Sequence, residues 1–142
     1  MTAIKRFEDI QAWQEARELT RMVYRVSTRG AFAKDYRLRD QIQGSAISVM
    51  SNIAEGFDAR TDPEFVRFLG YARRSATELQ CQLYIALDQN YITQQEFDPI
   101  YAQATKTKSL IGGFIRYLEG RSKVRSPTSD VGHRTSDVGH RT

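Results

Sequence analysis

The sequence predicts an all-α protein, folded as an up-down-up-down antiparallel four-helix bundle. Apolar residues recur at helical spacing in four long segments, and no segment alternates between apolar and polar residues as a strand does. Capping residues, glycine or proline stand at the ends of these segments. The connections between them are short, which forces neighbouring helices to run antiparallel. We therefore expect one bundle over residues 1–120, followed by a basic, flexible tail over residues 121–142.

The first helix is expected to run from about Glu8 to Thr28, where Gly30 ends it. Its inward stripe consists of Trp13, Ala16, Leu19, Thr20, Val23, Tyr24 and Ser27. The second helix is expected from about Lys34 to Glu55, and Gly56 ends it. Its inward stripe consists of Leu38, Ile42, Ala46, Val49 and Ile53.

The third helix is expected to open at Thr61-Asp62-Pro63-Glu64, with an N-cap followed by Pro63 at the first helical position, where the missing proline N–H costs nothing. Asn90 closes this helix because asparagine tolerates the left-handed conformation. The fourth helix opens with the capping box Thr93–Glu96 and extends to Gly120. The inward stripes are Phe65, Phe68, Leu69, Ala72, Ala76, Leu79, Leu83, Ala86 and Leu87 in the third helix, and Phe97, Ile100, Tyr101, Ala104, Ile111, Phe114, Ile115 and Leu118 in the fourth.

Composition excludes several classes of protein. With 142 residues, 40% of them hydrophobic and 27% charged, the chain has the composition of one soluble globular domain. It has no apolar run typical of a leader or a membrane span, so we expect a cytoplasmic protein that does not contact a membrane. Cys81 is the single cysteine, and the two histidines, His133 and His140, both lie in the tail. Neither a disulfide nor a zinc set can therefore form within the bundle, and we expect no cofactor.

The positive charge of the chain is concentrated in its tail. Residues 1–120 carry a net charge of +1, whereas residues 121–142 carry +3. The tail contains the exact duplication of Thr128–Arg134 as Thr135–Arg141. We interpret it as a flexible extension with two solvated histidines; the alternative is a metal site formed by His133 and His140 of stacked chains.

Polar residues on the second helix suggest either a site or a structural contact. Ser45, Ser48, Asn52 and Glu55 occupy one sector directly beside the apolar stripe. A serine nucleophile would need a base and a di-iron site would need histidines, but residues 1–120 contain no histidine. We therefore expect no enzymatic activity. We expect instead a structural hydrogen-bonded network between the second and third helices, formed by Ser48, Asn52, Glu55, Ser75 and Glu78 with Gln82 nearby.

A row of arginines is the candidate binding surface. Arg17, Arg21, Arg25 and Arg29 are spaced by four along the outer side of the first helix. Such a ridge can follow the phosphate backbone of RNA or DNA, without sequence specificity. The alternative is a solvated face partly balanced by Glu18.

Several apolar residues lie off the inward stripes and suggest an oligomer. They could equally be scattered exposed side chains, which are common on soluble proteins. These residues are Ile47, Met50, Phe57, Val66, Tyr84 and Ile85. Lys108 falls on the inward stripe of the fourth helix, so its ammonium group is expected to extend to the bundle edge or toward a partner chain.

The chain also resembles a known family over about residues 7–118. The pattern begins with Phe7, Trp13-Gln14 and Tyr24, and its most specific part is Asn52-Ile-Ala-Glu-Gly56 at the end of the second helix. Further matching residues are Ile10, Ala16, Leu19, Tyr36, Leu38, Gln41, Ile42, Ala46, Ser48, Glu64, Phe65, Phe68, Leu69, Ala72, Ser75, Glu78 and Leu79. Together they resemble the four-helix-bundle proteins of the 23S rRNA intervening-sequence family.

The resemblance implies a cytoplasmic bundle that assembles as a ring-like homopentamer without enzymatic activity. It also implies similarity to the accessory subunit of diversity-generating retroelements, which binds a reverse transcriptase and nucleic acid. Relatives commonly carry basic residues directly after the Gln-Ile pair of the second helix, where this chain has Gln43 and Gly44. We expect a non-enzymatic oligomer that binds nucleic acid through the arginine row and the basic tail. The alternative is a protein-interaction adaptor, such as a reverse-transcriptase partner.

Overall fold

The computed structural model describes residues 3–125, and all regular secondary structure in this range is helical. Of the predicted tail, residues 121–125 continue the last helix, whereas residues 126–142, with the duplicated repeat, His133 and His140, lie outside the described residues. The elements are a 3-10 turn η1 (Phe7–Asp9) and the helices α1 (Gln11–Ser27), α2 (Gly30–Lys34), α3 (Tyr36–Phe57), α4 (Asp62–Asp88) and α5 (Gln94–Arg125).

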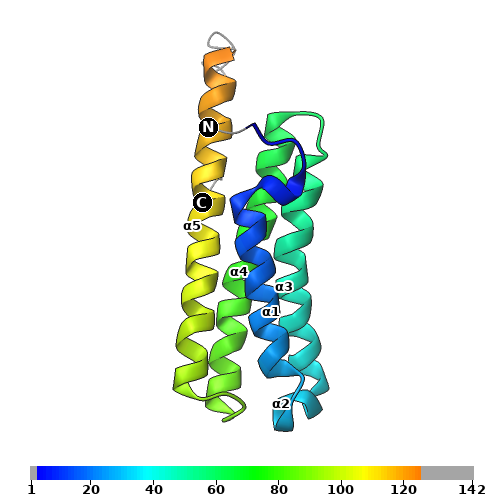
Figure 1. Ribbon diagram of the computed structural model, residues 1–142, viewed down its shortest axis with the longest axis vertical. Coiled ribbons are helices and arrows are strands. Elements are labelled where there is room, and N and C mark those ends of the chain that lie inside the picture. Colours follow the sequence, from blue (N-terminus) through cyan, green and yellow to red (C-terminus); the bar gives the residue numbers. More distant parts are fainter. Residues whose placement is uncertain (1–2, 126–142) are drawn as a thin grey trace.

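The four long helices α1, α3, α4 and α5 lie side by side along the long axis, and each connection reverses the direction of the chain (Figure 1). Helix α3 packs against α1 and α4, and α5 packs against the same two helices on the other side. Helix α2 is a single short turn at the end where α1 meets α3 (Figure 1). The predicted all-α, up-down-up-down bundle is confirmed for the single chain.

Three predicted helix ends are confirmed by their hydrogen bonds and dihedral angles. Thr61 Oγ1 accepts a bond of 3.3 Å from the N–H of Glu64 and caps α4, so that Pro63 occupies the second helical position and not the first. Thr93 and Glu96 form the reciprocal capping box, with distances of 2.9 and 3.2 Å. Asn90 has a φ of 61°, the left-handed conformation expected at the end of α4. These local contacts account for where α4 and α5 begin and where α4 ends.

Other helix ends differ from the prediction. Helix α1 begins only at Gln11, because residues 7–9 form the 3-10 turn and Ile10 is extended. Gly30, with a φ of 57°, follows the end of α1 as expected, but it also begins the additional helix α2. Helix α3 then starts at Tyr36, where Asp35 caps it by accepting the N–H of Leu38. Helix α5 continues through Gly120 to Arg125, so that glycine does not terminate it.

Gly56 does not end its helix either; it lies inside α3 and is buried. A Cβ atom at this position would lie 2.7 Å from Cδ1 of Phe65 and 3.0 Å from Cβ of Phe68. Both distances are shorter than ordinary van der Waals contacts. The glycine therefore allows α3 and α4 to approach closely beside the ring of Phe65. Its role is to permit this packing and not to terminate the helix.

The apolar interior consists of two clusters, one in each half of the bundle. Around the end that carries α2, the buried residues are Leu19, Val23, Val26, Phe32, Leu38, Ile42, Ala46, Leu79, Leu83, Ala86, Ile92, Phe97, Ile100 and Ala104. Around the end that carries η1, they are Ile10, Ala12, Ala16, Val49, Ile53, Phe65, Leu69, Ala72, Ala76, Ile111 and Leu118. Most of the predicted inward stripes are thus confirmed, but Tyr24 is 37% exposed and Trp13 is only partly buried.

Hydrogen bonds cross all four seams between neighbouring long helices near the level where the two apolar clusters meet. We call this set of contacts the polar belt. Thr20 Oγ1 lies 3.4 Å from the carbonyl of Ala46, joining α1 to α3. Gln103 Nε2 donates to Glu15 over 2.8 Å, joining α5 to α1. The other members are Ser45, Ser48, Ser75 and Gln82 between α3 and α4, and Gln80 and Thr105 between α4 and α5.

The α3–α4 part of the belt contains the predicted polar network in altered form. Ser48 Oγ and Ser75 Oγ are 2.8 Å apart, and Asn52 Nδ2 donates to Ser48 Oγ over 3.0 Å. Ser45, which is buried, donates to Gln82 Oε1 over 2.9 Å. No buried side-chain nitrogen or oxygen of the described residues lacks a partner. Polar atoms at this seam are therefore compatible with a dry interior.

Glu55 and Glu78 were wrongly assigned to this network. Both are exposed, and neither makes a hydrogen bond or ion pair with the described part of the chain. Each side chain lies farther round its helix than the serines, so its carboxylate reaches water. A carboxylate in water needs no internal partner, whereas the shorter serine hydroxyls at the seam do.

We predict that Gly56→Ala destabilises the protein by about 1–2 kcal/mol, because the added methyl group overpacks the contact with Phe65. Gly44→Ala in the same helix is the matched control, since a Cβ there meets nothing within 4 Å. It is expected to stabilise by up to about 1 kcal/mol through helix propensity. Urea unfolding followed by circular dichroism measures both. Equal stabilisation by the two variants would contradict the packing role of Gly56.

We predict that Ser45→Ala costs about 1–3 kcal/mol of unfolding free energy, because it leaves the buried oxygen of Gln82 without its donor. Adding Gln82→Leu removes both partners and should cost less than the sum of the single variants. Ser51→Ala, also in α3, is the control, since Ser51 makes no side-chain hydrogen bond within residues 3–125. Strict additivity of the two belt variants would show that this contact does not stabilise the seam.

Candidate nucleic-acid interface

The predicted arginine ridge is only partly a single row. Arg17, Arg21 and Arg25 lie on α1 and are exposed. Arg29 is exposed too, but α1 ends at Ser27 and Arg29 has an extended backbone, with a φ of −136°. The spacing of four residues therefore keeps three arginines on one helix, while the fourth turns away toward α5.

The four arginines differ in their partners. Arg21 Nη1 pairs with Glu18 Oε1 at 3.1 Å, and Arg29 pairs with Glu96 of α5. Arg17 lies over the ring of Trp13, 5.9 Å from its centroid. Neither Arg17 nor Arg25 forms an ion pair with a carboxylate in the part of the chain described. Because exposed ion pairs contribute only about 0–1 kcal/mol, Arg21 and Arg29 can exchange their carboxylates for a phosphate at low cost.

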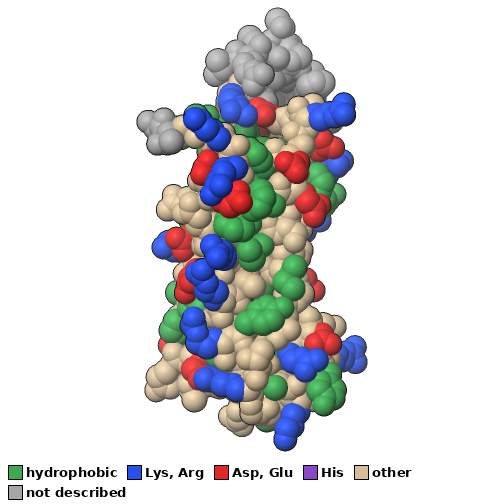
Figure 2. Space-filling view, turned by 45° about the vertical axis from the view of Figure 1, so that its right-hand side comes forward, with side chains coloured by type: hydrophobic (Ala, Val, Ile, Leu, Met, Phe, Trp, Pro, Cys, Tyr) green, Lys and Arg blue, Asp and Glu red, His purple; other side chains and the backbone are tan. Residues whose placement is uncertain are grey.

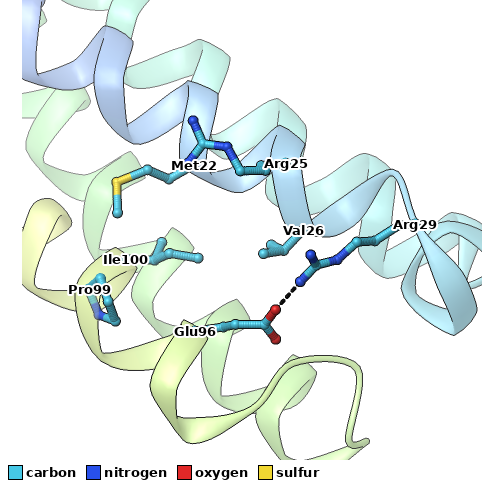
Figure 3. Close-up of a pocket in the computed structure, with 7 residues that line it drawn as sticks. All are labelled: Met22, Arg25, Val26, Arg29, Glu96, Pro99 and Ile100. Carbon is cyan, nitrogen blue, oxygen red and sulfur yellow. Dashed lines mark hydrogen bonds and ion pairs between the residues drawn. The ribbon is translucent and has the colours of Figure 1, made fainter.

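A shallow hollow of about 190 Å³ separates Arg25 from Arg29 (Figure 3). It is lined by Met22, Arg25, Val26, Arg29, Glu96, Pro99 and Ile100. Glu96 points at Arg29, whereas the guanidinium group of Arg25 extends away from Glu96, along Met22 (Figure 3). The apolar lining residues form the walls of the hollow. Its charged lining residues are Arg25, Arg29 and Glu96.

Glu96 is a site residue that the sequence analysis recognised only as a cap. The N–H of Thr93 donates to its carboxylate, and this bond is the main reason that the pKa of Glu96 lies below its ordinary value. The guanidinium group of Arg29 lowers the pKa further, against an opposing effect of partial burial. Glu96 is therefore charged at neutral pH and neutralises one of the four arginines.

A larger cavity of about 750 Å³ opens at the end of the bundle where the α3–α4 connection meets α5. Ile10, Phe65 and Phe114 are among its apolar walls. At its mouth Arg121 donates from Nε and Nη2 to Asp62 at 3.1 and 2.8 Å. This bidentate contact, which raises the pKa of Arg121, joins α5 to the start of α4.

The described residues contain no cluster of side chains suited to binding a metal ion. Within 3–125, no group of three or more His, Cys, Asp or Glu side chains could hold a metal ion. Cys81 is exposed and unpaired. No helix within residues 3–125 is long and apolar enough to cross a membrane.

Several large apolar side chains of the described residues are exposed. Of the predicted off-stripe residues, Ile47, Tyr84 and Ile85 are 46%, 50% and 45% exposed, while Met50, Phe57 and Val66 are only partly exposed. Figure 2, which brings the α3 side forward, shows a broken strip of hydrophobic side chains beside a column of Lys and Arg interspersed with Asp and Glu. This face thus presents exposed apolar side chains beside charged side chains of both signs.

Comparison with known proteins agrees with the helical architecture. No curated protein matches the chain. A solved structure from Bacteroides thetaiotaomicron VPI-5482, a protein of unknown function from the S23 ribosomal protein family, has a similar fold with a TM-score of 0.66. It is 24% identical, and the match covers 73% of this chain and 97% of that one. The family model for the 23S rRNA-intervening sequence protein matches residues 8–113, and the chain therefore belongs to this family.

Proposed function

We propose that this protein is a non-enzymatic cytoplasmic bundle that binds the phosphate backbone of RNA or DNA through its basic outer surface. The observation that carries the proposal is the exposure of Arg17 and Arg25 on one helix without a carboxylate partner in the described structure. Arg21 lies between them and is held only by an exposed ion pair. Together the three guanidinium groups form a positive edge along α1, with Arg29 beyond its end.

The physics of this edge favours backbone binding over sequence recognition. Guanidinium groups release condensed counterions when they neutralise phosphates, so affinity depends on salt. Backbone contacts carry no base information, so RNA and DNA of any sequence should bind alike at this edge. Glu18 and Glu96 reduce the charge of the edge and make a single copy a weak binder.

Assembly into a ring-like homopentamer, which the resemblance implies, is part of this proposal. A ring would repeat the arginine edge around its circumference, and simultaneous contacts would raise the affinity without any new interaction. The exposed apolar side chains Ile47 and Ile85 supply contact area for such an interface.

A second candidate function is that of a protein-interaction adaptor, such as an accessory subunit of a reverse transcriptase. It is favoured by exposed apolar side chains next to the α1–α3 seam, where Tyr24, Tyr36 and Ile47 are 37%, 64% and 46% exposed. Aromatic and aliphatic groups beside arginines are typical of the centre of a protein interface. An adaptor would bind nucleic acid only when its protein partner is supplied.

We predict that Arg17→Glu combined with Arg25→Glu lowers the affinity for a nucleic acid by at least about tenfold at low salt, and lowers the magnitude of the salt slope by about two. Arg37→Glu combined with Arg60→Glu is the control with the same change of charge, since both residues are exposed and form no ion pair within residues 3–125. Fluorescence anisotropy at several salt concentrations measures both. Equal losses in the two double variants would remove the edge as the binding site.

We predict that multi-angle light scattering at micromolar concentration yields a mass several times the 16.3 kDa of one chain. A monomer under these conditions would contradict ring assembly. It would also contradict the gain in affinity expected from several arginine edges binding at once. Ile47→Asp introduces a charge on the exposed apolar surface, whereas Gln41→Asp places the same charge on an exposed polar position of the same helix. If the α1–α3 face forms the interface, only the Ile47 variant should lower the mass.

A further inference from the structure

A second positive surface lies on the opposite side of α4 from the polar α3–α4 contacts, where α4 packs against α5. Its members come from both helices and follow the same seam. We call them the α4–α5 seam: Arg73, Gln80, Tyr84, Tyr101, Lys108 and Arg116.

Two guanidinium groups meet at one end of this seam, above a glycine. A Cβ atom on Gly112 would lie 3.3 Å from Nη1 of Arg73 and 3.6 Å from Nη1 of Arg116. The two arginines come from different helices, α4 and α5, and still approach the same point. The missing side chain at Gly112 leaves room for them, and Arg116 Nη2 would also lie 3.8 Å from a Cβ on Gly113.

This pair lacks the carboxylates that neutralise part of the α1 edge. Neither Arg73 nor Arg116 forms an ion pair with a residue in the range 3–125. Glu119, one turn beyond Arg116, is exposed and also makes no ion pair there. Two like charges over one glycine repel one another, and an anion between them would convert the repulsion into attraction for both.

Lys108 adds a third cation that a buried residue holds in place. Gln80 is 6% exposed, and its Nε2 donates to Thr105 Oγ1 over 2.9 Å and to the carbonyl of Tyr101 over 3.3 Å. These bonds leave the amide oxygen, which accepts from Lys108 Nζ at 3.1 Å. The ammonium group is thus positioned on the seam within the same chain.

The other end of the seam is aromatic. The ring of Tyr84 lies 5.8 Å from that of Tyr101 and 5.0 Å from that of Phe97, and Tyr84 is 50% exposed. Contact with Phe97 and Tyr101 restrains the ring while leaving half of the side chain accessible. An exposed, restrained tyrosine beside a line of cations is the arrangement on which an unpaired base can stack.

We propose that the α4–α5 seam binds a single strand of nucleic acid, with its phosphates on Arg73, Arg116 and Lys108 and a base on Tyr84. From Gly112 to Tyr101 the seam extends about 16 Å along α5, at 1.5 Å per residue. A duplex keeps its bases stacked inside, so it can use the cations but not the tyrosine. This inference rests on the proposed function, because its ligand is also a nucleic acid, but it assigns a different surface.

The test compares a labelled single-stranded RNA with the duplex of the same sequence, by fluorescence anisotropy on the full chain at low salt. Arg73→Glu combined with Arg116→Glu should weaken binding of the single strand by at least about tenfold. Tyr84→Leu keeps an apolar contact with Phe97 but removes the stacking face. It should weaken binding of the single strand several-fold and leave duplex binding unchanged.

Arg37→Glu combined with Arg60→Glu is again the control with matched charge, and thermal unfolding verifies that each variant is folded. If the control double variant weakens binding as much as the Arg73 and Arg116 double variant, the proposal that the seam binds a single strand is overturned. It is also overturned if Tyr84→Leu affects single strand and duplex equally.

The outcomes separate the two surfaces. Loss of binding only in the Arg17 and Arg25 double variant would overturn the proposal that the seam binds nucleic acid, and it would support the proposed function of the α1 edge. Loss only in the Arg73 and Arg116 double variant would support the seam and remove the α1 edge as the contact. Wild-type protein that binds neither RNA nor DNA at low salt would overturn both.

Discussion

The polar belt is the constraint on which the arrangement of the four helices depends. Two apolar clusters, above and below it, would tolerate a shift of one helix along another, because apolar contacts are not directional. Hydrogen bonds such as Ser45 to Gln82 and Gln103 to Glu15 do not tolerate it. A shift by one helical turn would leave buried donors and acceptors without partners, at a cost of about 1–3 kcal/mol for each. The belt thus defines the register, and the apolar clusters supply most of the stabilisation.

The packing of the interior also positions the outer surface. Every buried side-chain polar atom in the described residues has a partner within the fold. The register set by the belt also determines which outer side chains meet. It places Arg73 and Arg116 over Gly112, and through Gln80 it holds Lys108 beside them. On α1, the same register lets Glu96 reach Arg29 and leaves Arg17 and Arg25 without a carboxylate.

Local rules predicted the helices well, and tertiary contacts account for most of what they missed. Thr61, Thr93 and Asn90 act through neighbours in sequence, so their roles could be read directly. Gly56 resembled a helix terminator, but its role depends on Phe65 of another helix. The serines of the network were correctly placed at the α3–α4 seam, while Glu55 and Glu78 were not. The angular position of a residue on its helix does not by itself show whether its side chain is exposed to solvent. Arg29 pairs with Glu96 of α5, and Arg73 lies over Gly112 of α5, so no spacing within one helix could have revealed either contact.

We propose that this family member binds the nucleic-acid backbone through guanidinium groups on its outer surface. A salt titration of wild-type binding, performed in parallel with two duplexes of the same length and unrelated sequence, tests this proposal. The logarithm of the association constant should fall linearly with the logarithm of the salt concentration, with the same slope and affinity for both sequences. An affinity that does not change with salt, or one that is confined to one of the two sequences, would contradict it.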